Sequence, residues 1–83
     1  MFHKEFSTEE KRKIAGFGPG DTVIYFERAS EEQIRWGGND DPEKFLTVGE
    51  EYTVKDVEIH SYHTKVFLEG IEGKFNSVSF RAK

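Results

Sequence analysis

The sequence predicts a mainly β fold, a small five-stranded barrel that carries a short N-terminal α-helix. The chain has 83 residues, which allows one domain with one hydrophobic core. Apolar residues make up only 35% of it, but aromatic residues reach 14%, so we expect a folded chain whose core is built from large rings. Short runs of β-branched and aromatic residues alternate with turns that contain glycine, which is the pattern of a strand-rich domain.

Residues 1–16 predict a helical appendage, which precedes a β-barrel domain at residues 17–83. Ser7 and Glu10 have the spacing of a capping box, in which both side chains bind backbone N–H groups at the helix start. Gly16 can end the helix in a left-handed conformation. Few apolar residues lie within the helix, so we expect it to lie outside the core.

Five runs are expected to form strands, near residues 21–27, 51–60, 64–69 and 75–82, with a short one near 45–48. Residues 22–26 are β-branched or aromatic throughout, so both faces of that strand are expected to be covered. Residues 70–73 contain two glycines and predict a tight turn. The expected core consists of Val23, Tyr25, Leu46, Tyr52, Val54, Val57, Ile59, Val66, Leu68, Val78 and Phe80.

The expected strand at residues 51–60 changes its alternation partway along. Tyr52 and Val54 share one parity, whereas Val57 and Ile59 have the other. Because side chains of a strand alternate between faces, such a change indicates one extra residue, a β-bulge. Small barrels need bends of this kind in order to close.

Two motifs carry a family resemblance that covers roughly residues 18–82. Gly49-x-x-Tyr52-x-Val54 is followed by Phe75-Asn76-Ser77-Val78-x-Phe80, and Gly20-Asp21 precedes the first expected strand. These segments resemble small SH3-like barrel proteins of bacteria and phages. The resemblance implies an SH3-like five-stranded barrel with a long loop after its first strand and a 3₁₀ turn before its last. In that turn, Asn76 or Ser77 would hydrogen-bond backbone groups; no activity follows from the resemblance.

The composition argues against several classes of protein. The net charge is −4, from 12 basic and 16 acidic residues, which disfavours binding to duplex nucleic acid. Cysteine is absent, so disulfides and thiolate metal sites are excluded. No run approaches the length of a membrane span, and the first residues lack the apolar centre of a signal peptide. We therefore expect a cytoplasmic protein without a cofactor, as a monomer or a weak homodimer.

The most acidic part of the chain lies between the first two long strands. One or two helical turns are expected at residues 30–36 and a loop at 37–42. Residues 16–46 contain seven acids and three bases, so they hold a charge of −4, equal to that of the whole chain. An aromatic residue on an acidic loop is typical of a binding site for a basic protein. The candidate partner-binding residues are Trp36, Arg35, Glu31, Glu32, Asp40, Asp41, Tyr25 and Tyr62. Alternatively, Trp36 caps the barrel and the acids are only solvated.

The leading functional hypothesis is a non-catalytic protein-binding module, a phage or bacterial accessory protein. A second hypothesis is a nucleic-acid or nucleotide-binding barrel, which would use Tyr25, Tyr62 and Phe67 together with Lys65 and the basic residues 11–13. A third is a metal-dependent enzyme at His60 and His63, which only a turn could bring together. No nucleophile motif and no carboxylate pair in an apolar context is present, so catalysis is not expected.

Overall fold

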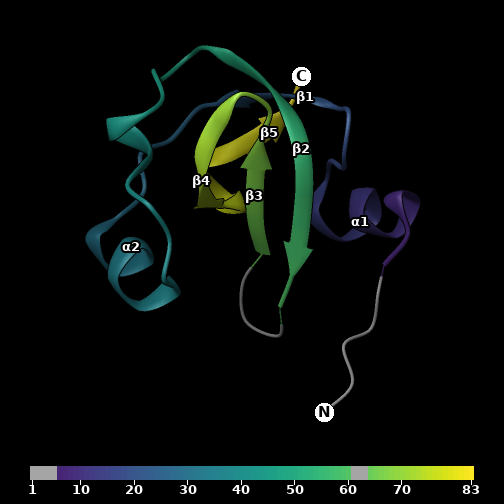
Figure 1. Ribbon diagram of the computed structural model, residues 1–83, viewed down its shortest axis with the longest axis horizontal. Coiled ribbons are helices and arrows are strands. Elements are labelled where there is room, and N and C mark those ends of the chain that lie inside the picture. The colour runs from purple at the N-terminus through teal and green to yellow at the C-terminus, as the bar shows by residue number, and fades with distance from the viewer. Residues whose placement is uncertain (1–5, 61–63) are drawn as a thin grey trace.

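The computed structural model describes residues 6–60 and 64–83, without the side chains of residues 36 and 37. Two helices, two 3₁₀ turns and five strands follow one another along this part of the chain (Figure 1). In chain order they are α1 (Thr8–Ala15), β1 (Thr22–Tyr25), α2 (Glu31–Gly37), η1 (Pro42–Lys44), β2 (Glu51–Ile59), β3 (Thr64–Leu68), β4 (Ile71–Asn76), η2 (Ser77–Ser79) and β5 (Phe80–Ala82).

The five strands form one antiparallel sheet in the order β4-β3-β2-β1-β5. The long strand β2 lies at the centre of the sheet. Its first residues pair with β1, and most of its length pairs with β3. The edge strands β4 and β5 do not pair with each other in the described residues. The mainly β prediction is therefore confirmed, whereas the sheet is open and does not have the closure expected of a barrel.

The bulge predicted in β2 is confirmed. The pairing with β3 passes from Val54 and Leu68 to Asp56 and Phe67, so Lys55 is the extra residue. Val54 and Val57 are both buried although they have opposite parity. The bulge thus allows both halves of β2 to face one core.

The predicted strand near residues 45–48 is wrong, because the chain there makes a turn. The Gly49 N–H donates to the Tyr25 carbonyl at 2.8 Å, and Gly49 has a φ of 94°, which favours glycine. The sheet still has five strands, because residues expected to form a turn belong to a strand. Strand β4 includes residues 71–73 of the turn expected at residues 70–73. The expected strand at residues 75–82 is divided by η2, where the Asn76 side chain accepts from the Val78 N–H at 3.1 Å as the resemblance implies.

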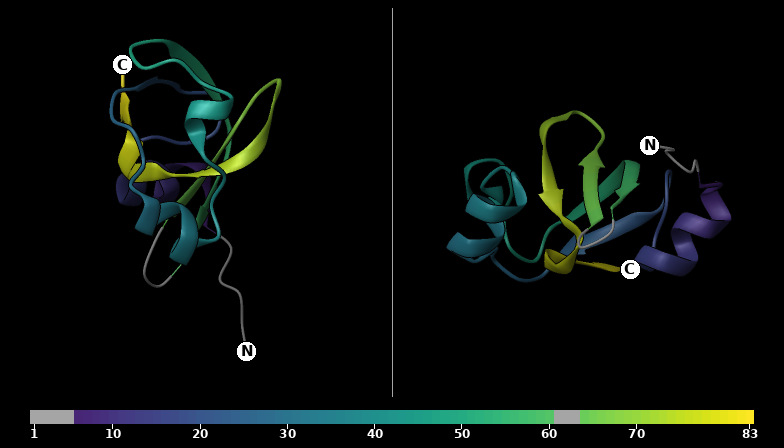
Figure 2. Two further views of the ribbon diagram at one scale, coloured as in Figure 1. Left: turned by 90° about the vertical axis from the view of Figure 1, so that its left-hand side faces the viewer. Right: turned by 90° about the horizontal axis from the view of Figure 1, so that it is seen from below.

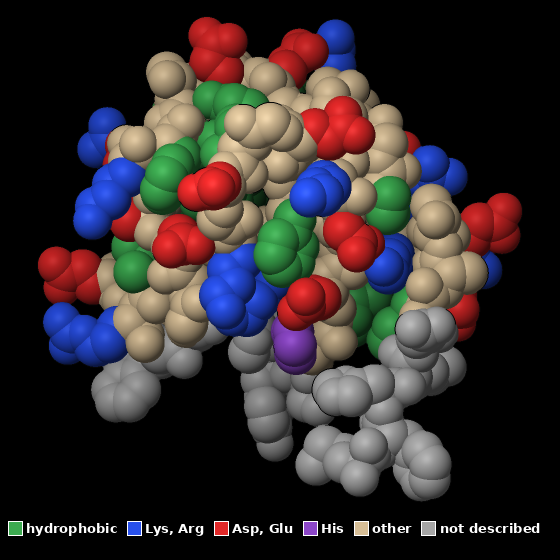
Figure 3. All heavy atoms as spheres, viewed as in Figure 1, with side chains coloured by type: hydrophobic (Ala, Val, Ile, Leu, Met, Phe, Trp, Pro, Cys, Tyr) green, Lys and Arg blue, Asp and Glu red, His purple; other side chains and the backbone are tan. Residues whose placement is uncertain are grey.

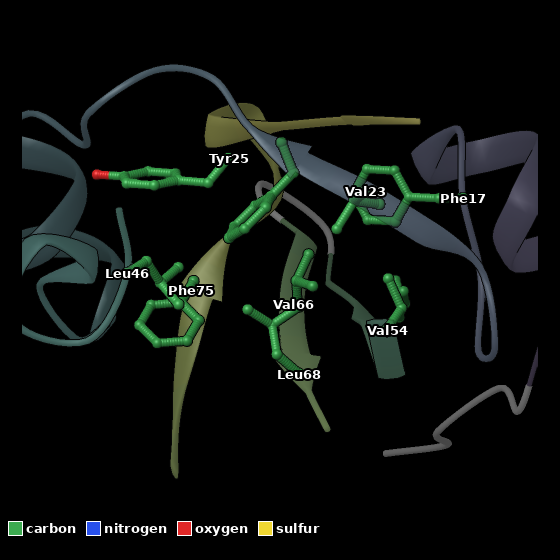
Figure 4. Close-up of a cluster of buried hydrophobic side chains, with 10 residues drawn as sticks. Phe17, Val23, Tyr25, Leu46, Val54, Val66, Leu68 and Phe75 are labelled. Carbon is green, nitrogen blue, oxygen red and sulfur yellow. The ribbon is translucent and has the colours of Figure 1, made fainter. Parts of the chain in front are cut away.

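Among the residues that the structure describes, ten buried hydrophobic residues form the core, most of them shown in Figure 4. Phe17 and Phe75 are buried but were not expected, and Val78 was expected to be buried but is 51% exposed. The 3₁₀ turn explains Val78, because it interrupts the alternation and places Ser79 inside. Tyr52 and Ile59 pack against the core and are only partly buried.

The helices lie at opposite ends of the molecule, with α1 beyond β2 and α2 beyond β4 (Figures 1 and 2). The capping box of α1 and its left-handed end at Gly16 are confirmed, and none of its residues is buried. Strand β1 buries Val23 and Tyr25 and leaves Ile24 partly exposed, so the expectation that both its faces are covered is wrong. The second face of this strand is thus only partly covered.

Candidate functional site

The candidate site is the acidic segment, residues 27–44, which joins β1 to η1 through α2. The predicted helical turns are confirmed as a seven-residue helix. Ser30 and Gln33 form a capping box at its start, and Gly38 ends it with a φ of 64°. The Ser-x-x-Gln spacing is readable in the sequence, so this capping box could have been predicted.

The end of α2 is held against the edge strand β4 and its neighbour β3. The Asp40 N–H donates to the Lys74 carbonyl and the Lys74 N–H to the Asp40 carboxylate, both at 2.9 Å. The Lys65 ammonium donates to the Gly38 carbonyl at 3.3 Å. Burial, and then the charge of Lys74, lower the pKa of Lys65. The end of the helix is thus attached to both β3 and β4.

The end of the segment is held by η1 and by a buried tyrosine. The Asp41 side chain accepts from the Glu43 N–H at 3.0 Å and caps η1. The Tyr25 hydroxyl donates to the Glu43 carboxylate at 2.8 Å, and Figure 4 shows this hydroxyl pointing out of the core. Glu43 also forms an ion pair with Arg28 at 2.7 Å. Burial, and then the hydrogen bond to Glu43, raise the pKa of Tyr25.

The predicted acidic residues therefore fall into two groups. Asp40 and Asp41 bind backbone N–H groups of the protein itself. Glu31 and Glu32 are exposed in the first turn of α2, and neither forms an ion pair within the described part of the chain. Arg35 is exposed in the last turn. Glu31 and Glu32 therefore present their charge outward, as does the exposed Glu27 before the helix, and none of the three forms an ion pair within the described part of the chain.

The predicted aromatic residues are not assembled on one surface. Tyr25 lies in the core with none of its surface exposed, and its ring centroid is 5.7 Å from that of Phe80. The backbone of Trp36 lies in α2, but its side chain is outside the described part, as is Tyr62. An exposed aromatic residue that the sequence analysis missed is Phe26, over which the Arg81 guanidinium lies at 5.6 Å. On the face shown in Figure 3, acidic and basic side chains are interspersed.

Several residues proposed for nucleic-acid binding are occupied by other contacts. Lys11 forms an ion pair with Asp56 at 2.7 Å, and Arg12 forms one with Asp21 at 2.8 Å. Lys65, which would have to reach a phosphate, is only 7% exposed. Fewer basic side chains are therefore available to bind the phosphates of a nucleic acid.

The proposed metal site is only partly within the described structure. His60 lies with its Nε2 atom 3.0 Å from a Glu58 carboxylate oxygen, whereas His63 is outside the described residues. Among residues 6–60 and 64–83, no group of three or more potential metal ligands is present. In the same part of the chain, no helix is long and apolar enough to cross a membrane.

Comparison with known protein families gives a match over most of the chain. Residues 29–82 match the family of the bacteriophage T4 protein Y07B. The matched segment contains α2, η1 and the strands β2 to β5. No curated protein and no solved structure matches the chain.

Proposed function

The chain belongs to the family of the bacteriophage T4 protein Y07B, and from this premise we propose a non-catalytic phage accessory protein that binds a basic protein. The binding surface is the acidic segment, and the binding residues are Glu31, Glu32, Arg35 and Trp36. The protein acts in the cytoplasm of the host cell. Its partner presents lysine or arginine side chains, which pair with the two glutamates.

One observation carries this proposal: the acidic segment is fastened to the sheet at its end, while the acids of its helix point to solvent. The Asp40 carboxylate accepts from the Lys74 N–H, and the Glu43 carboxylate accepts from the Tyr25 hydroxyl. These two hydrogen bonds fix the position of α2. Glu31 and Glu32 are thereby held in place before a partner arrives. A preorganised surface loses less conformational entropy on binding than a flexible loop does.

We further propose that the sheet is an SH3-like barrel that is only partly closed. Four features support it: Gly20-Asp21 precedes β1, a long connection follows, β2 is bent by a bulge, and η2 precedes β5. An experimental structure tests this proposal. Strand β4 should curve toward β5 in such a barrel and should stay flat in a simple meander.

Capture of partners from a lysate of phage-infected bacteria tests the binding proposal. The wild-type protein is compared with a Glu31→Lys, Glu32→Lys variant and with Trp36→Ala, and the captured proteins are quantified by mass spectrometry. We expect a basic protein that is captured at least about tenfold less by both variants, since central aromatic and charged contacts dominate interfaces.

The matched control is Glu69→Lys, Glu72→Lys, which changes the charge equally on exposed positions at the turn into β4. It should retain the partner. Asp40 and Asp41 are left unchanged, because their side chains hold the fold. Equal capture by all four proteins, or equal loss in the control, would overturn the proposal.

A further inference from the structure

Helix α1 is attached to the rest of the molecule with little apolar contact. None of its residues is buried, and Ile14 is 53% exposed. Within the helix, Ala15 is the residue that packs against the core. Burial of apolar area is the main stabilising contribution in most helix packing, so it contributes little here.

Two neighbouring ion pairs tie the helix to the rest of the chain, besides the contact of Ala15 with the core and the close approach of Thr8 and Arg12 to Gly18. Lys11 binds Asp56 at the bulge of β2, and this carboxylate also accepts from the Val57 N–H at 2.8 Å. Arg12 binds both carboxylate oxygens of Asp21, at 2.8 and 2.9 Å. Such pairs are partly exposed and are therefore weakened by salt.

The chain after the helix provides a place where it can separate. Gly16 has a φ of 90°, and nothing lies within 4 Å of where a Cβ atom would stand on it. The next residue, Phe17, is buried in the core and is 2% exposed. A rotation at Gly16 would thus move α1 and leave Phe17 and the sheet in place.

We infer that α1 is a detachable arm, which the two ion pairs hold on the sheet and which salt releases at Gly16. A helix of eight residues does not persist alone in water, so the released arm unfolds. Release frees Lys11 and Arg12 to bind other anionic groups. The arm is in this way a conformational switch that is independent of the proposed partner-binding surface.

Amide hydrogen exchange of the whole chain, followed by NMR, tests the inference at about 0.02 M and about 1 M sodium chloride. We expect the amides of residues 11–16 to exchange about fivefold to tenfold faster in high salt. The amides of Tyr25 and Val66, which lie in the sheet, should change little. Their rates report opening of the core.

An Asp21→Asn, Asp56→Asn variant should reproduce the fast exchange of the arm in low salt and lose the response to salt. Asparagine keeps an oxygen that can accept from the Gly18 and Val57 N–H groups, so the turn and the bulge are retained. Glu72→Gln removes a charge elsewhere and should behave as wild type. Exchange of the arm in step with the sheet, or an unchanged rate in the double variant, would overturn the inference.

Discussion

Phe75 joins the aromatic part of the core. Its ring lies 6.0 Å from the ring of Phe45 and 6.3 Å from that of Phe80, and none of its surface is exposed. We expect Phe75→Ala to lower the free energy of unfolding by about 3 to 5 kcal/mol, because it removes buried area and leaves a cavity. Urea denaturation measures this change.

The exposed Val78 provides the control, since Val78→Ala should change the free energy of unfolding by less than about 0.5 kcal/mol. If Phe75→Ala does not fold, Phe75→Leu keeps most of the volume and should show a smaller loss in the same direction. Similar losses for Val78→Ala and Phe75→Ala would contradict this description of the core.

Tyr25 couples the core to the acidic segment, and its ionisation should reveal this. Its pKa is raised by burial and by the Glu43 carboxylate. Since the pKa is higher in the folded than in the unfolded chain, the stability it contributes is present below about pH 10 and lost above it. We expect Tyr25 to ionise only as the protein unfolds. Absorbance of tyrosinate during an alkaline titration checks this.

The Tyr25→Phe variant should lack the rise in tyrosinate absorbance that accompanies unfolding in the wild type. It should also lower the free energy of unfolding by about 1 kcal/mol, because Glu43 loses a hydrogen bond. A titration of the wild type in which every tyrosine ionises before any loss of structure would show that Tyr25 is accessible.

At the scale of elements, the bulge in β2 determines which side chains reach the core. Deletion of Lys55 would place Tyr52, Val54, Val57 and Ile59 in simple alternation on the core face and would remove the bend that the bulge gives to β2. We expect the deletion variant to stay folded, with a dispersed NMR spectrum, and to lose about 1 to 3 kcal/mol of its unfolding free energy because the straightened strand packs less well. Lys55→Ala keeps the extra residue, so its unfolding free energy should stay within about 0.5 kcal/mol of wild type.

The sequence predicted those elements whose signals are local. The capping box at Ser7 and Glu10 and the change of parity around Lys55 are visible in short windows, and both are confirmed. The division of residues 75–82 by a 3₁₀ turn was implied only by resemblance, because the run keeps strand-like spacing through Val78 and Phe80. The inward direction of Phe75 depends on its pairing opposite Val66 in the neighbouring strand, which the alternation within residues 75–82 does not show.

The candidate site was less predictable than the fold, because acidic residues look alike in a sequence. Asp40 and Glu31 belong to the same acidic segment, yet Asp40 binds Lys74, which lies 34 residues further along. The sequence contains no sign of that pairing. The structure therefore separates the acids that hold the segment from those that face solvent.

At the scale of the whole molecule, acid should weaken the protein. The Arg12 hydrogen bond and the Gly18 N–H lower the pKa of Asp21. Burial raises the pKa of Asp56, but the Lys11 ammonium and the Val57 N–H outweigh it, so this pKa is lowered too. A carboxyl whose pKa is lowered on folding contributes stability above its unfolded pKa of about 3.9, and this is lost as the pH falls.

We expect the melting temperature to fall as the pH is lowered from about 5 to about 2. The Asp21→Asn, Asp56→Asn variant should melt at a lower temperature near neutral pH and should depend less on pH over this range. Calorimetry at several pH values checks both. A variant with the same pH dependence as wild type would show that other carboxyls dominate acid unfolding.

The pairing of Asp40 with Lys74 affects how copies of the protein can associate at high concentration. An outer strand with open backbone groups can recruit a strand of another molecule and begin aggregation. Here Asp40 occupies the N–H and carbonyl groups of Lys74 in β4, and the other outer strand, β5, has only three residues. The middle of the β4 edge is therefore closed to a strand of another molecule, and β5 offers only a short edge, so we expect edge-to-edge pairing between copies to be disfavoured.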